Sequence, residues 1–118
     1  MPIWEERADA WHDVQPGVRR RILTHCDALT MVLYDIAPST TFASHTHPHL
    51  QSGVVMEGGG TFTIEGVAHP VHKGSSYVVP GGAKHELKTH AVGPTVILDV
   101  FVPRRDDFAP EALAPDRP

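Results

Sequence analysis

Glycine and proline interrupt this chain so often that only short segments of regular structure fit between them. The 118 residues include 10 glycines and 11 prolines. From Val18 onward, no window of about ten residues has the apolar spacing of an amphipathic helix. Short apolar segments bounded by Gly and Pro are typical of β-strands. The sequence therefore predicts an all-β domain.

The segments between these breaks predict nine strands, a number typical of a β-sandwich or barrel. Glu65 and Gly66 predict a tight hairpin between two of them, because glycine adopts positive φ without steric cost. The predicted strands are residues 18–24, 28–37, 41–47, 51–57, 60–65, 67–72, 75–79, 84–90 and 95–102.

The length fits one domain, since a chain of this size buries roughly two-thirds of its unfolded surface. We predict an N-terminal extension over residues 1–17, a barrel over 18–105 and a C-terminal tail over 106–118. Residues 4–13 could form one helical turn or an additional edge strand. The tail contains Pro110, Pro115 and Pro118 among scattered charges, which suggests a loosely held end.

Charge and composition exclude several classes of partner. The 10 Lys and Arg against 14 Asp and Glu give a net charge of −4, which argues against nucleic acid. No window approaches the roughly 20 apolar residues of a membrane span. Cys26 is the only cysteine, and the charged opening MPIWEERADAWHD is unlike a signal peptide, so we expect a cytoplasmic protein.

Residues 45–51 read HTHPHLQ and suggest a metal site. On a strand, His45 and His47 project from one face with Cα atoms roughly 6.6 Å apart, close enough to bind one ion. A turn at Pro48 would bring Gln51 back beside them on the next strand and leave His49 at the bend. Gln51 could alternatively hydrogen-bond to a water that serves as the ligand.

A fourth ligand must come from a distant segment. GSSYVVPGGAKH reaches His85 after a predicted strand, Pro80 and a glycine-rich turn, so His85 fits this role. The alternative is that these histidines lie on the surface of an ordinary β-protein. His69, His72 and His90 lie outside the two motifs, and we expect them to face solvent.

HTHPHLQ followed by GVVMEG resembles the first cupin motif, and Gly74, Pro80, Gly82 and His85 have the spacing of the second. The resemblance implies a single-domain double-stranded β-helix, a jelly-roll barrel. It also implies one divalent metal ion held by His45, His47, Gln51 and His85. The sequence does not distinguish Ni, Zn, Fe and Mn.

A finer resemblance, to the KdgF group of small cupins, covers nearly the whole chain through PGVRRRIL, the HPH and Gln51 combination, and LDVFVPRRDDF. It implies ring opening of 4,5-unsaturated uronic acid monosaccharides, with Asp99, Phe101 and Arg105 as the catalytic residues. Three features depart from the group and leave the substrate open. They are Leu50, the pair Gly53-Val54 and the turn Gly58-Gly59-Gly60.

Residue parity alone also draws attention to Asp99. It shares a strand face with Phe101, whereas Val96, Leu98 and Val100 share the other, so Asp99 and Phe101 are predicted to face the barrel interior. A structural Asp beside a core Phe is the alternative. Tyr77 is a possible pocket hydroxyl. Arg20 faces opposite to Arg19 and Arg21, so the three form no single patch.

Replacing a carboxylate ligand by neutral Gln51 makes the metal a stronger Lewis acid toward an anionic substrate and leaves proton transfer to another group, for which Asp99 is the best candidate. Three other functions stay open. Three histidines with an amide also suit an Fe(II) dioxygenase, and the chain could be a small cupin isomerase or cyclase or a non-catalytic sugar-acid module. We expect a homodimer formed through sheet edges.

Overall fold

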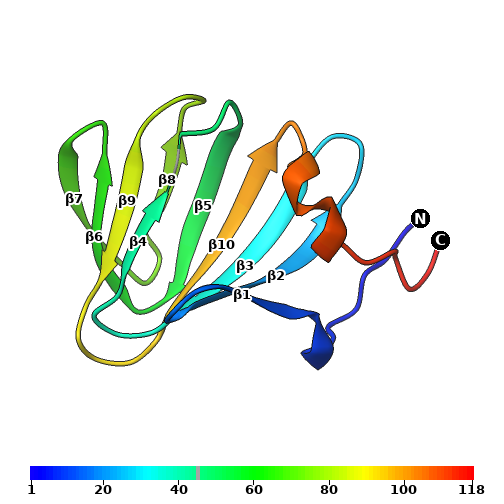
Figure 1. Ribbon diagram of the computed structural model, residues 1–118, viewed down its shortest axis with the longest axis horizontal. Helices are drawn as coiled ribbons and strands as arrows, with labels where there is room; N and C mark the ends of the chain where they lie inside the picture. Colours follow the sequence, from blue (N-terminus) through cyan, green and yellow to red (C-terminus); the bar gives the residue numbers. More distant parts are fainter. Residues whose placement is uncertain (45) are drawn as a thin grey trace.

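The structure is a computed structural model that describes residues 1–44 and 46–118. In this part of the chain, ten strands and two short 3-10 segments follow one another (Figure 1). They are η1 (Ala8–Ala10), β1 (Trp11–Gln15), β2 (Val18–His25), β3 (Thr30–Ile36), β4 (Thr41–Ser44), β5 (Leu50–Glu57), β6 (Gly59–Ile64), β7 (Val67–His72), β8 (Ser76–Val79), β9 (His85–Thr89), β10 (Thr95–Val102) and η2 (Asp106–Glu111).

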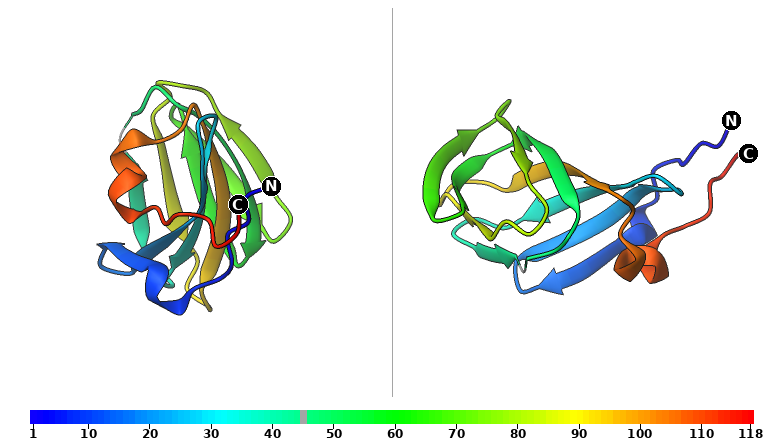
Figure 2. Two further views of the ribbon diagram at one scale, coloured as in Figure 1. Left: turned by 90° about the vertical axis from the view of Figure 1, so that its right-hand side faces the viewer. Right: turned by 90° about the horizontal axis from the view of Figure 1, so that it is seen from above.

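The strands form two sheets in which every pairing is antiparallel. One sheet has the order β1-β2-β3-β10-β5-β8 and the other the order β4-β9-β6-β7. Figure 2 shows how the two sheets curve toward each other, so that the chain forms a single β-barrel of the predicted all-β jelly-roll class. None of the helical segments among the described residues is long and apolar enough to cross a membrane.

Burial alternates along the central strands as the pleat requires. In β10, Ile97, Asp99 and Phe101 are buried and the residues between them are partly exposed. The predicted orientation of Asp99 and Phe101 toward the interior is therefore confirmed. The hairpin between β6 and β7 is also confirmed, with φ of 51° at Glu65 and 79° at Gly66.

The N-terminal segment contains both of the structures that the sequence left open. Ala8–Ala10 forms one 3-10 turn, and β1 then pairs with β2 as the edge strand of the larger sheet. Residues 1–17 thus contribute one strand to the sheet. The two ends of the chain lie side by side in both views of Figure 2, joined by a bridge between Ile3 and Arg117.

The prediction of one strand over residues 41–47 is wrong for its end. β4 stops at Ser44, and Thr46 and His47 have no strand structure. The chain leaves the smaller sheet here, because β4 pairs with β9 whereas β5 pairs with β10 and β8. β4 and β5 are consequently not a hairpin, although the chain turns at Pro48 as predicted.

The expectation of a loosely held C-terminal end is wrong for η2. Phe108 is only 4% exposed. Glu111 accepts hydrogen bonds from Arg20 Nε and Nη2 at 3.0 and 2.6 Å, and the Trp4 indole N–H donates to the Leu113 carbonyl at 2.8 Å. The local sequence of the tail could not predict these contacts, because the partner residues lie more than 90 positions away in the sequence.

Candidate functional site

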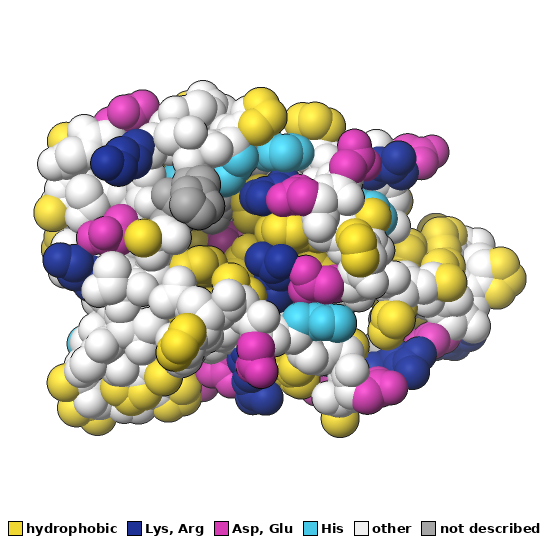
Figure 3. All heavy atoms as spheres, viewed as in Figure 1, with side chains coloured by type: hydrophobic (Ala, Val, Ile, Leu, Met, Phe, Trp, Pro, Cys, Tyr) yellow, Lys and Arg dark blue, Asp and Glu magenta, His cyan; other side chains and the backbone are white. Residues whose placement is uncertain are grey.

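The two sheets enclose a cavity of about 520 Å³. Figure 3 shows the hollow in the molecular surface, with basic and acidic side chains along its rim. One part of the wall is apolar and includes Ile36, Phe42, Phe62, Leu87, Ile97, Phe101 and Phe108. The other part carries polar side chains, among them Arg20, Tyr34, His47, His49, Gln51, Tyr77, His85, Asp99, Arg105 and Asp107.

His47 and His85 present the same ring nitrogen to this cavity. His47 Nδ1 lies 3.1 Å from the carbonyl oxygen of His49, and His85 Nδ1 lies 3.0 Å from that of Ala83. A carbonyl oxygen only accepts, so each Nδ1 carries the proton and donates it. Each neutral ring then keeps a lone pair on Nε2, the arrangement found in metal-binding histidines.

Gln51 provides the third donor atom, and its amide orientation is determined by its neighbours. Its Nε2 donates to Asp99 Oδ2 at 3.0 Å, so Oε1 faces His47 Nε2 at 3.2 Å. Two acceptors thus face each other. A divalent cation held by His47 Nε2 and Gln51 Oε1 would relieve this contact, because both atoms offer a lone pair to it.

The surroundings disfavour the other way of relieving that contact, which is protonation of the ring. Burial lowers the pKa of His47, and the nearby Arg105 guanidinium lowers it further. Burial also lowers the pKa of His85. Both rings are held in the neutral form, which is the form that binds a metal ion.

The fourth proposed ligand, His45, lies outside the described residues. Within residues 1–44 and 46–118, no three His, Cys, Asp or Glu side chains gather around one point. The donors that the structure does bring together are two imidazoles, whose ring centroids are 5.2 Å apart, and one amide. This donor set fits a divalent transition metal.

Asp99 lies beside these donors and is 3% exposed. It stands opposite Gly53, and Gly53 stands opposite Tyr77, on three neighbouring strands. The Tyr77 hydroxyl reaches across Gly53 and donates to Asp99 Oδ1 at 2.5 Å. A Cβ on Gly53 would overlap both the carboxylate and the hydroxyl, so the absence of a side chain there makes this contact possible.

Both carboxylate oxygens of Asp99 thus accept a hydrogen bond, one from Tyr77 and one from Gln51. Burial raises the pKa of Asp99 to about 7, and the two hydrogen bonds oppose that rise. Burial together with the Asp99 charge raises the pKa of Tyr77, so this hydroxyl stays a donor. Asp99 can therefore exchange a proton with a bound molecule near neutral pH, while Tyr77 keeps its own proton.

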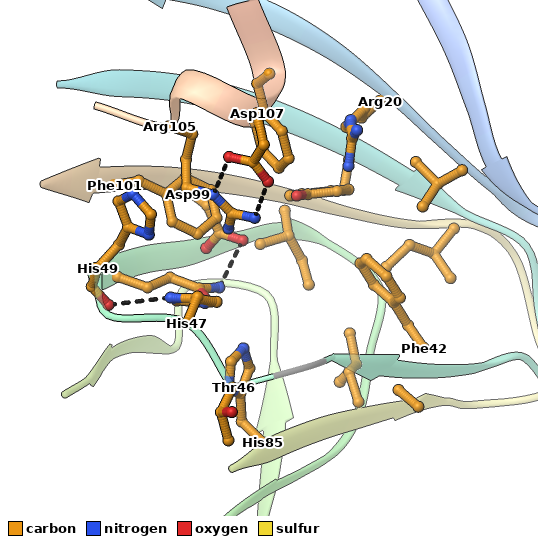
Figure 4. A pocket seen from close by; sticks show the side chains of 18 of the residues that line it. Arg20, Phe42, Thr46, His47, His49, His85, Asp99, Phe101, Arg105 and Asp107 are labelled. Carbon is orange, nitrogen blue, oxygen red and sulfur yellow. Dashed lines mark hydrogen bonds and ion pairs between the residues drawn. The ribbon is translucent and has the colours of Figure 1, made fainter. Parts of the chain in front are cut away.

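Arg105 follows β10 and lies at the rim of the cavity, as Figure 4 shows. Its guanidinium carbon is 4.8 Å from the centre of the Phe101 ring. Nε and Nη2 donate to the two carboxylate oxygens of Asp107 at 2.9 and 2.7 Å, and this pairing lowers the pKa of Asp107. An anionic ligand that binds Arg105 must either share the guanidinium with Asp107 or displace the Asp107 carboxylate.

The cavity therefore brings together six of the seven predicted site residues, namely His47, Gln51, His85, Asp99, Phe101 and Arg105. Their roles remain predictions. His49, which we placed at the bend, lines the cavity and accepts from His47 through its carbonyl oxygen. His69, His72 and His90 are exposed, as expected.

Sequence reasoning missed two further charged side chains of this wall, Arg20 and Asp107. Strand parity was a usable signal for Arg20. It placed Arg20 opposite to Arg19 and Arg21, and the inner face of β2 is the face that lines the cavity. No signal in the sequence pointed to Asp107, because its position depends on how η2 folds back over the barrel.

Comparison with known proteins agrees with the fold and the motif spacing. Residues 32–101 match the cupin domain. The chain belongs to the cupin family, which generally binds a metal ion. It is 30% identical to the pectin degradation protein KdgF of Dickeya dadantii over 99 residues, which cover 83% of this chain and 89% of that protein.

Two solved structures are similar to this chain in fold and in sequence. KdgF from Halomonas sp. superimposes with a TM-score of 0.76 at 32% identity, over 83% of this chain and 89% of that one. An RmlC-like cupin from Shewanella frigidimarina has the same TM-score at 26% identity, over 83% of this chain and 86% of that one.

Proposed function

We propose that this protein is a metal-dependent cupin enzyme that converts 4,5-unsaturated uronic acid monosaccharides to linear keto acids. The similarity to KdgF over most of both chains supports the substrate class. The observation that carries the proposal is the position of Gln51, whose amide joins the histidine donors on one side and Asp99 on the other.

His45, His47, Gln51 and His85 would hold the metal ion, which could be Ni, Zn, Fe or Mn. When bound, such an ion polarises oxygen atoms of an anionic substrate as a Lewis acid. Because Gln51 is neutral, the four ligands cancel none of the positive charge of the ion. The apolar wall excludes water and strengthens electrostatic interactions inside the cavity.

Arg105 binds the substrate carboxylate, for which its planar guanidinium has the matching bidentate geometry. It now holds Asp107 in that geometry, so the substrate carboxylate takes over these hydrogen bonds. Phe101 packs against the sugar ring. Its own ring lies between Arg105 and His47, at 4.8 Å from the guanidinium carbon and 5.5 Å from the imidazole centre.

Asp99 transfers the proton. Water adds its oxygen to C5 of the sugar and a proton to C4, which removes the double bond and gives a hemiketal. The bond between C5 and the ring oxygen then breaks, leaving a ketone at C5 and a hydrated aldehyde at C1. No electron is gained or lost, so the reaction needs no oxidant. Asp99 suits this role because Tyr77 and Gln51 hold its carboxylate in place.

The test is a spectrophotometric assay of unsaturated galacturonate and of the corresponding monomer from alginate, after metal analysis of the purified protein. We expect the ultraviolet absorbance of the double bond to disappear at the same rate with and without oxygen. Oxygen consumption in proportion to product would identify a dioxygenase instead. Tight binding of these acids without turnover would identify a non-catalytic module.

A further inference from the structure

Arg20 is a second guanidinium in the wall of the cavity. It lies on the inner face of β2 between the buried residues Val18 and Ile22, directly opposite Tyr34 of β3. Figure 4 shows it extending into the cavity from one side, with His47 and His85 on the other. An arginine in this position interrupts an otherwise apolar strand face.

The neighbouring arginines of β2 have a different environment. Arg19 pairs with Asp35 on the outer face at 2.7 Å, and its side chain is 49% exposed. The side chain of Arg20 is 17% exposed. Because a mostly buried guanidinium loses hydration, an inward position is costly unless the group has partners inside the protein or in a bound molecule.

Glu111 is one partner of the Arg20 guanidinium inside the protein. It accepts from Nε and Nη2 of Arg20, which uses two of the five guanidinium N–H groups. The guanidinium carbon also lies 3.9 Å from the centre of the Phe108 ring, and that of Arg105 lies 4.2 Å from the same centre. Two cations thus contact one ring at the border between η2 and the cavity.

We propose that Arg20, with the Tyr34 hydroxyl beside it, forms a second polar subsite that binds the oxygen atoms of the ligand farthest from the metal-binding end. This inference rests on the proposed function for the kind of ligand, a sugar acid. The subsite would make the cavity selective for ligands that carry oxygen atoms at both ends. A purely apolar end would leave the Arg20 guanidinium desolvated without a new acceptor.

The experiment compares two acids with the same carboxylate and a six-membered ring. D-Galacturonate carries oxygen atoms around the ring, whereas cyclohexanecarboxylate carries none. Their dissociation constants are measured by calorimetry on the purified, metal-loaded protein. We expect the wild type to bind D-galacturonate at least about tenfold more tightly, as one or more hydrogen bonds to a charged group would provide.

Arg20→Met removes the charge and keeps most of the side-chain length. It should weaken D-galacturonate binding about tenfold and leave cyclohexanecarboxylate unchanged. Arg20→Lys, which keeps the charge and loses the planar fork, should be intermediate. Glu111→Gln is the matched control, because it weakens the same ion pair and leaves the guanidinium in the cavity. It should not weaken the binding of either acid.

Three results would overturn the inference. Equal losses in Arg20→Met and Glu111→Gln would show that Arg20 only holds η2 in place. Equal weakening of both acids in Arg20→Met would show a general effect of charge. Equal affinity of the wild type for the two acids would show that the proposed subsite does not exist. If Arg20→Met does not fold, Arg20→Lys against Glu111→Gln decides the question.

These measurements do not depend on turnover. Selective binding of D-galacturonate that is lost in Arg20→Met supports the subsite even if no unsaturated uronate is converted. Conversion of unsaturated uronates with unchanged binding in Arg20→Met supports the enzyme and removes the subsite. Failure of the inference and failure of the proposed function are therefore distinguishable.

Discussion

The two faces of the six-stranded sheet differ in how they combine polar and apolar side chains. Antiparallel sheets commonly bury apolar residues and expose polar ones. Here the inner face carries Arg20, Tyr34, Gln51, Tyr77 and Asp99 beside buried apolar residues such as Val32, Ile36 and Phe101. The outer face carries apolar side chains that remain partly or fully exposed, including Met31, Leu33, Leu50, Val54, Met56, Val78, Leu98, Val100 and Val102.

The difference separates a face that encloses the cavity from a face that is open to solvent. A buried polar group costs free energy unless it is hydrogen-bonded, and the inner polar groups are paired with one another, as Asp99 is with Tyr77 and Gln51. The outer apolar side chains have no such internal partners. Contiguous exposed apolar surface marks interaction sites. The inner face therefore fits ligand binding and the outer face fits contact with another chain.

The largest effect is expected from His85→Ala, which removes a proposed metal ligand on β9 of the smaller sheet without touching the apolar core around Val32 and Ile36. Bound metal and turnover should both fall to background, a loss larger than the about 10- to 100-fold that a supporting residue costs. Metal analysis and a thermal melt measure this. The control is His69→Ala, because His69 is exposed on β7. Full metal content in the His85→Ala variant would exclude His85 as a ligand.

Asp99→Asn should follow in size. The amide oxygen can still accept from Gln51, so the metal should stay bound, while loss of proton transfer should lower kcat by about 10²- to 10⁴-fold. The control is Asp35→Asn, a carboxylate on the outer face paired with Arg19. Turnover within about threefold of wild type would mean that Asp99 is structural.

Gly53→Ala should have a smaller effect, on stability. The new Cβ overlaps the contact between Tyr77 and Asp99, and overpacking of this kind costs about 1–3 kcal/mol in the free energy of unfolding. Urea denaturation measures it. Ser52→Ala, on the outer face of the same strand, should change stability by less than about 0.5 kcal/mol. An unchanged midpoint in Gly53→Ala would contradict the close packing.

The smallest effect on folding is expected from Val78→Lys, which tests the expected homodimer through sheet edges on β8, the edge strand of the larger sheet. Val78 is 56% exposed, so the free energy of unfolding should change by less than about 0.5 kcal/mol. Light scattering should show a dimer for the wild type and a monomer for this variant. Val92→Lys, in the loop before β10 and 82% exposed, is the control. A monomeric wild type would show that the homodimer prediction is wrong.

Local sequence determined most of the strands. The pleat makes residue parity readable, so the inward position of Asp99 and Phe101 and the outward position of Leu98 followed from the sequence of one strand. Gly and Pro placed the breaks, and the turn at Pro48 brought Gln51 within 3.2 Å of His47. These features depend on neighbours along the chain, which is why sequence patterns reveal them.

Tertiary structure alone decided the contacts between distant segments. The amide of Gln51 is oriented by Asp99, 48 positions away. Arg20 meets Glu111 91 positions away, and this contact holds the tail that the sequence suggested was loose. β4 and β5 are adjacent in the chain yet lie in different sheets. Parity tells which way a side chain points, whereas its partner depends on which strands pair, and that pairing is a property of the whole barrel.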